Sequence, residues 1–92
     1  MKHKARGVFV ILNEKGLHTR PSTELVRLAA KYRSQIQLSY RSYVVNAKSL
    51  LGILMLAAER GAKIVIDAIG EDAEDAVRGI LQLAQSRFYV KY

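Results

Sequence analysis

The chain of 92 residues contains no cysteine and no tryptophan, and it has a single proline. Without cysteine there is no disulfide framework and no thiolate metal site, which fits a reducing compartment. The longest apolar run, residues 50–58, falls well short of the roughly 18 residues that a membrane span needs. No secretory apolar region or cleavage site follows the basic residues 1–4. We therefore expect a cytoplasmic protein with no membrane insertion.

Acidic residues are scarce as well. Eight Asp and Glu stand against 15 Lys and Arg, so the net charge is +7. Such an excess favours an acidic partner, which could be a nucleic acid, a membrane surface or an acidic protein. The basic residues are scattered, however, so a solvated basic surface explains them equally well. Half of the residues are hydrophobic, which argues against disorder, and the length allows one core. We expect one domain over residues 1–92.

Hydrophobic periodicity predicts strands and helices in the order β-α-β-β-α-β-α. The expected strands cover residues 7–12, 35–40, 43–47 and 63–69, and the first of them is expected in the centre of the sheet. The expected helices cover residues 21–32, an apolar segment that begins after Ser49 and ends before Gly61, and a segment that begins near residues 71–75 and buries Val77, Ile80, Leu81, Ala84 and Phe88. This order indicates an α+β fold, with helices on one face of a four-stranded sheet. Arg41-Ser42 does not suit a tight type I′ turn, so we expect a different or longer loop between residues 40 and 43.

The most informative segment is Gly16-Leu17-His18-Thr19-Arg20-Pro21. The proline is typical of a helix start, because its missing N–H is unpaired there in any case. His18 should then lie at the N-terminal end of a helix, where free N–H groups near Thr19 and Arg20 and the helix dipole favour an anion. An imidazole can carry a phosphoryl group transiently, and the guanidinium of Arg20 can neutralise it in a bidentate manner. A turn or cap histidine without chemistry is the plain alternative. His3, with no helix start and no arginine two residues on, is interpreted as an ordinary terminal residue.

The hexapeptide resembles the active-site signature of the HPr family, the histidine phosphocarriers of the bacterial phosphotransferase system. A second stretch, Asn46-Ala47-Lys48-Ser49-Leu50-Leu51-Gly52-Ile53-Leu54, is similar to the segment around that family's regulatory serine. The likeness covers about residues 8–83. It implies an antiparallel open-faced β-sandwich, a sheet covered on one face by three helices, in which His18 accepts the phosphoryl group on Nδ1. It also implies enzyme I as donor, enzyme IIA-type domains as acceptors, and a relay protein rather than an independent enzyme.

Two further surfaces have both a functional and a structural interpretation. Ser49 is a good N-cap in its own right, and the resemblance implies that the HPr kinase/phosphorylase phosphorylates it. The helix after it has no polar face, so some of its residues should be exposed as a docking surface, although most could instead be core. Leu50, Leu51 and Leu54 match family positions that meet partners. Basic residues are expected to form one positive face around His18: Lys15, Arg20, Arg27 and Lys48.

Other functions remain as alternatives. One is a nitrogen-type regulatory relative of HPr without a sugar-transport role. Another is a basic nucleic-acid-binding module, which the charge and five tyrosines favour but which lacks a recognised motif. A small hydrolase is disfavoured, because we expect neither a base and orienting carboxylate beside His18 nor a cleft in so small a domain. We expect no cofactor, no metal and a monomer, and the sequence offers no account of the aromatic and basic residues 87–92.

Overall fold

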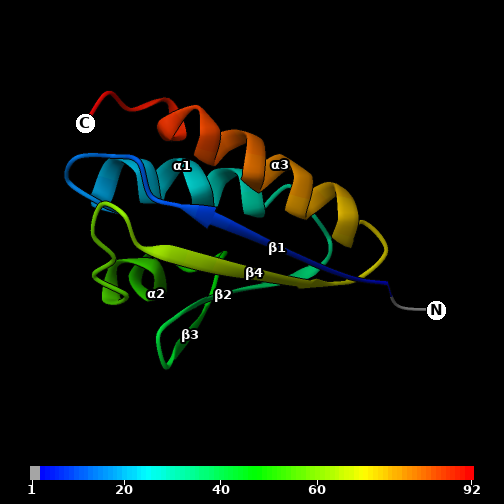
Figure 1. The fold of residues 1–92 in the computed structure, drawn as a ribbon. Coiled ribbons are helices and arrows are strands. Elements are labelled where there is room, and N and C mark those ends of the chain that lie inside the picture. Colours follow the sequence, from blue (N-terminus) through cyan, green and yellow to red (C-terminus); the bar gives the residue numbers. More distant parts are fainter. Residues whose placement is uncertain (1–2) are drawn as a thin grey trace.

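The computed structural model describes residues 3–92 and is built from four strands and three helices (Figure 1). In chain order the elements are β1 (Lys4–Val10), α1 (Thr19–Ala29), β2 (Gln35–Tyr40), β3 (Tyr43–Asn46), α2 (Leu50–Met55), β4 (Lys63–Ile69) and α3 (Ala73–Gln85), followed by a short 3-10 helix, η1 (Arg87–Tyr89). The strands form one antiparallel sheet in the order β1-β4-β2-β3. The predicted α+β fold and its element order are confirmed.

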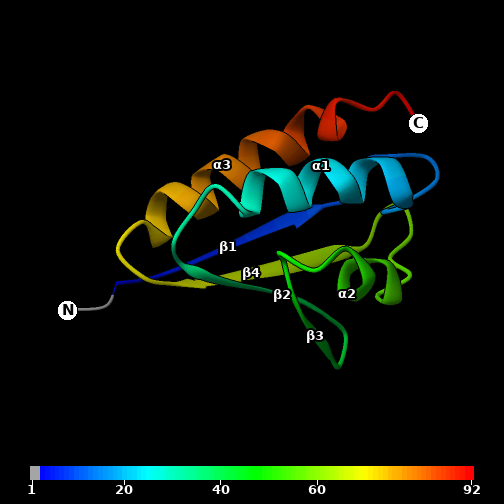
Figure 2. The ribbon, with the colours of Figure 1, turned by 180° about the vertical axis from the view of Figure 1, so that it is seen from behind.

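Long helices cover one face of the sheet, and the other face is open (Figures 1 and 2). α1 and α3 lie side by side over β1, β4 and β2, while the shorter α2 lies beside the N-terminal half of α1. Alternation along the strands produces the core, because Ile64 and Ile66 of β4 and Leu38 of β2 are almost wholly buried beneath the helices. Leu25 of α1 and Ile80 of α3 complete it from above, both fully buried.

The first strand lies at an edge of the sheet, so its expected central position is wrong. β1 pairs with β4 alone and spans Lys4–Val10 instead of residues 7–12. Val8 and Val10 point to the open face and are 44% and 46% exposed. An apolar β-rich run is typical of a central strand, but here half of that run lies on an uncovered surface.

The hairpin between β2 and β3 is tight. Its loop differs from a type I′ turn, as expected, because Arg41 but not Ser42 has a positive φ, but it is not longer. Tyr40 pairs with Tyr43, so only Arg41 and Ser42 form the loop. Arg41 takes the left-handed conformation, with φ of 56°, at a cost of about 1–2 kcal/mol. Burial of Leu38 on one face fixes the register, since a slip by one residue would expose it. The Arg41 guanidinium also lies over the Tyr40 ring at 5.1 Å, a favourable cation–π contact.

Helix ends differ from the expected ones in three places. α1 begins at Thr19 and ends at Ala29, so Tyr32 lies beyond it. α2 ends at Met55, and Gly61 caps no helix; its N–H donates to Ile11 in a separate turn. Phe88 lies outside α3 but is fully buried, as the hydrophobic pattern predicted.

Candidate functional site

His18 is the N-cap residue of α1, as the sequence predicted. The residues around it are anchored in the protein. Leu17 is buried, its N–H donates to the carbonyl of Ala58, and its own carbonyl accepts the hydroxyl of Ser22. Gly16 has φ of 69°, and a Cβ there would meet the Ala58 carbonyl oxygen, so only glycine fits this close approach. The loop therefore holds the His18 backbone in place while its ring remains partly exposed.

The N-terminal end of α1 carries no anion of its own. No acidic residue lies in the first turn, and the His18 side chain makes no capping hydrogen bond. The first helical bond is donated by the Ser22 N–H to the His18 carbonyl, and Pro21 has no N–H. Within residues 3–92, the N–H groups of Thr19 and Arg20 have no acceptor. Free donors and the positive end of the helix dipole therefore coincide beside His18.

Tyr92 packs on the His18 ring, and Arg20 and Lys15 in turn contact Tyr92. The ring of Tyr92 stacks on it, with centroids 5.4 Å apart and an interplanar angle of 22°. Arg20 Nη1 donates to the Tyr92 hydroxyl at 3.0 Å, and Lys15 Nζ lies 4.9 Å from the centroid of the Tyr92 ring. Within residues 3–92, His18 Nε2 is buried without a hydrogen-bond partner. Two cations and an aromatic ring thus gather at the open end of α1.

The other two basic residues of the expected positive face lie elsewhere. Arg27, eight residues along α1, is paired with Glu24 at 3.3 Å. Lys48 Nζ donates to the carbonyl of Tyr32, beyond the opposite end of α1 from His18. An eleven-residue helix is about 16 Å long, so Lys48 does not join the cluster at His18. Lys15 and Arg20 are the members of that face that the structure brings together.

Ser49 is the N-cap of α2, and its Oγ accepts the N–H of Gly52 at 3.0 Å. Among the apolar residues of this helix, Ile53 is fully buried, whereas Leu50 and Leu51 are 36% and 69% exposed. Leu54 is half-buried. The sequence analysis missed Met55, which is the most exposed residue of the helix at 70%. Methionine in an apolar run carries no signal for its direction, so only the observed helix phase reveals it.

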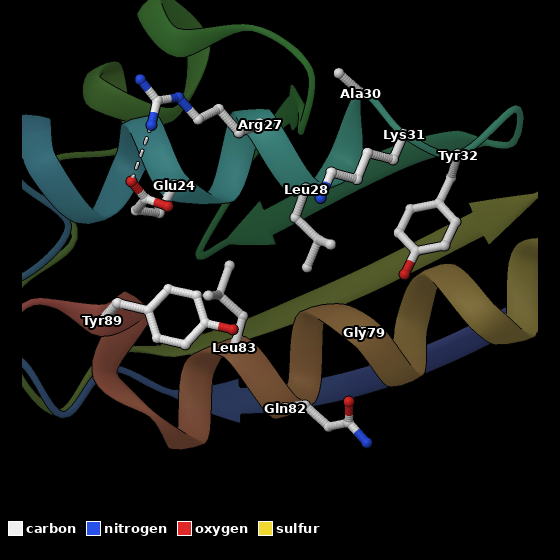
Figure 3. Close-up of a pocket in the computed structure, with 10 residues that line it drawn as sticks. All are labelled: Glu24, Arg27, Leu28, Ala30, Lys31, Tyr32, Gly79, Gln82, Leu83 and Tyr89. Atoms are coloured by element: carbon white, nitrogen blue, oxygen red, sulfur yellow. Dashed lines mark hydrogen bonds and ion pairs between the residues drawn. The ribbon is translucent and has the colours of Figure 1, made fainter.

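A groove of about 600 Å³ lies between α1 and α3 (Figure 3). Leu28 and Leu83 face one another across it, and the rings of Tyr32 and Tyr89 stand at its two ends. Its cations do not converge, since the Arg27 guanidinium turns aside to Glu24. His18 does not line this groove.

Two side chains whose pKa is displaced from its ordinary value, Asp72 and Arg6, lie outside the site. The Ser34 hydroxyl and the N–H of Arg33 donate to Asp72 at the start of α3 and lower the pKa of its carboxyl. A hydrogen bond to Asp67 raises the pKa of Arg6 on the open face of the sheet. Across residues 3–92 no group of three or more His, Asp or Glu could hold a metal ion, and no helix is long and apolar enough to cross a membrane.

An open-faced α+β sandwich that presents a histidine and an arginine at a helix N-terminus has the architecture of a small phosphocarrier. A family model described as the PTS HPr component phosphorylation site matches residues 5–86. The chain therefore belongs to the HPr family of the phosphotransferase system.

Solved structures agree with this assignment. HPr-C-His from Thermoanaerobacter tengcongensis is 34% identical, with a TM-score of 0.90 over 96% of this chain and 99% of that one. The phosphocarrier protein HPr from Bacillus anthracis str. Ames is 30% identical, with a TM-score of 0.84 over 89% and 98%. The catabolite repression protein Crh of Bacillus subtilis, described as a swapped dimer, is 31% identical, with a TM-score of 0.73 over 80% and 85%.

Proposed function

We propose that His18 accepts a phosphoryl group from phosphorylated enzyme I and passes it to enzyme IIA-type acceptors. The observation that carries this proposal is a partly exposed histidine at a helix N-terminus whose free N–H groups have no anion of their own. Such an end is suited to hold phosphoryl oxygens. Arg20, two residues on, supplies a guanidinium that can form two parallel hydrogen bonds to them. Membership of the HPr family supports the same role.

The chemistry is a displacement at phosphorus. The lone pair of a His18 ring nitrogen attacks the phosphorus of the donor phosphohistidine, the donor's P–N bond breaks, and its electron pair returns to the donor ring. Burial of Nε2 leaves Nδ1 as the accepting nitrogen. In the second transfer His18 is the leaving group, and its electron pair returns to Nδ1. The protein's part is to position the group and neutralise its charge, which phosphoryl transfer mainly requires.

The decisive experiment incubates the protein with phosphoenolpyruvate and enzyme I, followed by intact-mass analysis before and after acid treatment. We expect one acid-labile phosphoryl group on the wild-type protein and on His3→Ala, and none on His18→Ala. His3 is the matched control, since it is exposed and lies before β1. Full labelling of His18→Ala would refute the assignment.

We further propose that the exposed residues of α2 dock the partner proteins. The surface consists of Leu50, Leu51 and Met55, with Leu54 half-buried beside them. It lies near the site because the loop that follows α2 contacts the loop before His18 through the Leu17–Ala58 hydrogen bond. Arg27 and Lys48 are proposed to contribute charge at its margin, where an acidic partner would be steered.

A charge within this surface should impair the enzyme-driven reaction. In the reaction that enzyme I catalyses, Leu51→Glu is expected to raise the KM for this protein as substrate at least tenfold, because the carboxylate must be desolvated in the complex. Its thermal midpoint should change little, since Leu51 is 69% exposed. Val44→Glu is the matched control, because Val44 is 58% exposed but lies in β3. Equal KM values for the two variants would argue against docking through α2.

Regulation through Ser49 is the remaining part of the proposal. A phosphate on its Oγ would stand at the start of α2, where the helix dipole tolerates negative charge, so it would act on partners rather than on the fold. The similarity to Crh, whose description names catabolite repression, favours a regulatory use. Incubation with ATP and HPr kinase/phosphorylase should place phosphate on Ser49, and an unlabelled Ser49 would leave it a cap alone. A nitrogen-type regulatory relative would pass the phosphoryl group to a different acceptor. Measuring phosphoryl transfer to purified enzyme IIA proteins of the sugar branch and of the nitrogen branch would distinguish the two.

A further inference from the structure

Tyr92 contacts three polar side chains at the N-terminal end of α1: His18, Arg20 and Lys15. Its ring stacks on His18, its hydroxyl accepts from Arg20, and Lys15 lies over its ring. We propose that Tyr92 is a positioning residue for phosphoryl transfer, whose hydroxyl holds the Arg20 guanidinium beside His18 before the phosphoryl group arrives. This inference rests on the proposed role of His18, and it assigns a function to the aromatic segment that the sequence analysis left unexplained.

The segment that delivers Tyr92, residues 86–92, is held firmly and is here called the strap. Arg87, Phe88 and Tyr89 all have positive φ, between 55° and 59°, a conformation that non-glycine residues adopt only where the surroundings enforce it. Phe88 enforces it, because its side chain is fully buried and packs edge-to-face on Phe9. After these three left-handed residues the C-terminal segment runs on past the end of α3 and ends near the loop that precedes α1 (Figure 1).

The far half of the strap is tied to the loop before His18. The buried side-chain amide of Asn13 donates to the carbonyls of Arg87 and Val90. The N–H of Lys15 donates to the main-chain oxygen of Tyr92 at 3.0 Å, and Val90 is buried. Since Asn13 also accepts the N–H of Gly16, one turn sets the position of both the strap and the active-site loop. The stacking of Tyr92 on His18 is therefore the outcome of several independent anchors.

The hydroxyl of Tyr92 is an uncharged acceptor for the Arg20 guanidinium, and a phosphoryl oxygen can replace it. A phosphoryl group offers charged oxygens that can accept two parallel hydrogen bonds from the guanidinium, whereas the hydroxyl is uncharged and accepts one. The exchange is therefore favourable, while the guanidinium has already been held beside the ring. Holding a long, flexible side chain in place beforehand spares the entropy of ordering it at the moment of transfer.

The experiment uses potassium phosphoramidate, a small donor that needs no partner protein. His18 attacks its phosphorus, the P–N bond breaks, and ammonia leaves with the electron pair. The rate of phosphohistidine formation is followed by 31P NMR for Tyr92→Phe, which removes the hydroxyl and keeps the ring. We expect a rate roughly threefold to tenfold lower than wild type, the net worth of one ordinary hydrogen bond, because the hydroxyl holds the guanidinium without touching the phosphoryl group. Tyr89→Phe, on the same segment but 74% exposed, is the matched control and should match wild type.

Two further measurements separate positioning from mere packing. In an Arg20→Gln background, Tyr92→Phe should have no additional effect, because the hydroxyl acts through the guanidinium. In the unphosphorylated wild type, nuclear Overhauser contacts should link the Tyr92 and His18 rings, and they should persist in Tyr92→Phe. An unchanged or faster rate for Tyr92→Phe, additive effects with Arg20→Gln, or absence of the ring contacts would each overturn the proposal. Labelling by phosphoramidate but not by enzyme I would instead count against the proposed relay and leave the role of Tyr92 standing.

Discussion

The helices α1 and α3 begin in opposite ways. α3 starts with its own acidic residues: Asp72 at the cap, and Glu74 and Asp75 in the first turn. The Asp72 carboxylate is occupied by the N–H groups of Arg33 and Ser34 and by the Ser34 hydroxyl. α1 starts with a histidine, has no acidic residue in its first turn and leaves the N–H groups of Thr19 and Arg20 without acceptors.

This difference distinguishes a helix N-terminus with a structural role from one that is free to bind an external anion. A helix N-terminus attracts negative charge wherever it occurs, so the attraction alone marks no site. At α3 the chain supplies that charge itself and uses it to join the segment before β2 to the helix. At α1 the charge must come from outside, and the neighbouring groups are cations and a nucleophile. Under the proposed function, a phosphoryl group would supply the negative charge that the sequence does not place at the start of α1.

The largest effect on this comparison should follow from changing the cation at α1. Arg20→Lys keeps the charge but loses the planar pair of donors. We expect phosphoryl uptake from phosphoramidate to fall roughly tenfold to a hundredfold, the range for hydrogen bonds to charged groups. Arg78→Lys, an exposed arginine of α3 paired with Asp75, should match wild type. Equal rates in the two variants would mean that the guanidinium at α1 has no special role.

A smaller effect should follow from making α1 resemble α3. Thr19→Glu places a carboxylate in the first turn of α1 at an exposed position. It should stabilise the fold by about 0.3–1 kcal/mol through the helix dipole and lower phosphoryl uptake by repelling the incoming group. Thr19→Gln, with the same shape and no charge, isolates the electrostatic part.

Relative to Thr19→Gln, Thr19→Glu should have a higher free energy of unfolding and a lower rate of phosphoryl uptake. Chemical denaturation gives the free energy of unfolding, and 31P NMR gives the rate of uptake. A variant that gained stability without losing uptake would show that the phosphoryl group does not use the end of α1.

The sequence predicted the starts of α1 and α2 correctly, because neighbouring residues determine both. The position of His18 followed from Pro21 and the amphipathic segment after it, and the capping role of Ser49 followed from its residue type. Contacts between distant residues escaped prediction. Nothing around Tyr92 indicates that it meets His18, because the contact depends on the burial of Phe88 and on the hydrogen bond from Asn13 to Arg87, which are 74 residues apart in the chain. Lys48 shows the same limit, since its partner is the carbonyl of Tyr32.

The smallest effect concerns the start of α3 and is a stability difference that depends on pH. Hydrogen bonds from Ser34 and Arg33 lower the pKa of Asp72 in the folded protein. The stability that this carboxylate contributes is therefore present above its ordinary pKa of about 3.9 and is lost as pH falls through the lower folded value. Asp72→Asn should be less stable than wild type at pH 6, and the difference should shrink as the pH is lowered below about 4.

Urea denaturation between pH 6 and pH 2 measures this gap, and Asp75→Asn is the control. Asp75 belongs to the same helix start, but its hydrogen-bond partner is the side chain of Arg78, which is itself exposed. A gap that stayed constant over this range for Asp72→Asn would show that its charge is not what joins the segment before β2 to α3. If the stability difference disappears at low pH as expected, the Asp72 carboxylate is a fixed part of the fold at the start of α3. A phosphoryl group bound transiently at the start of α1 cannot have that structural role.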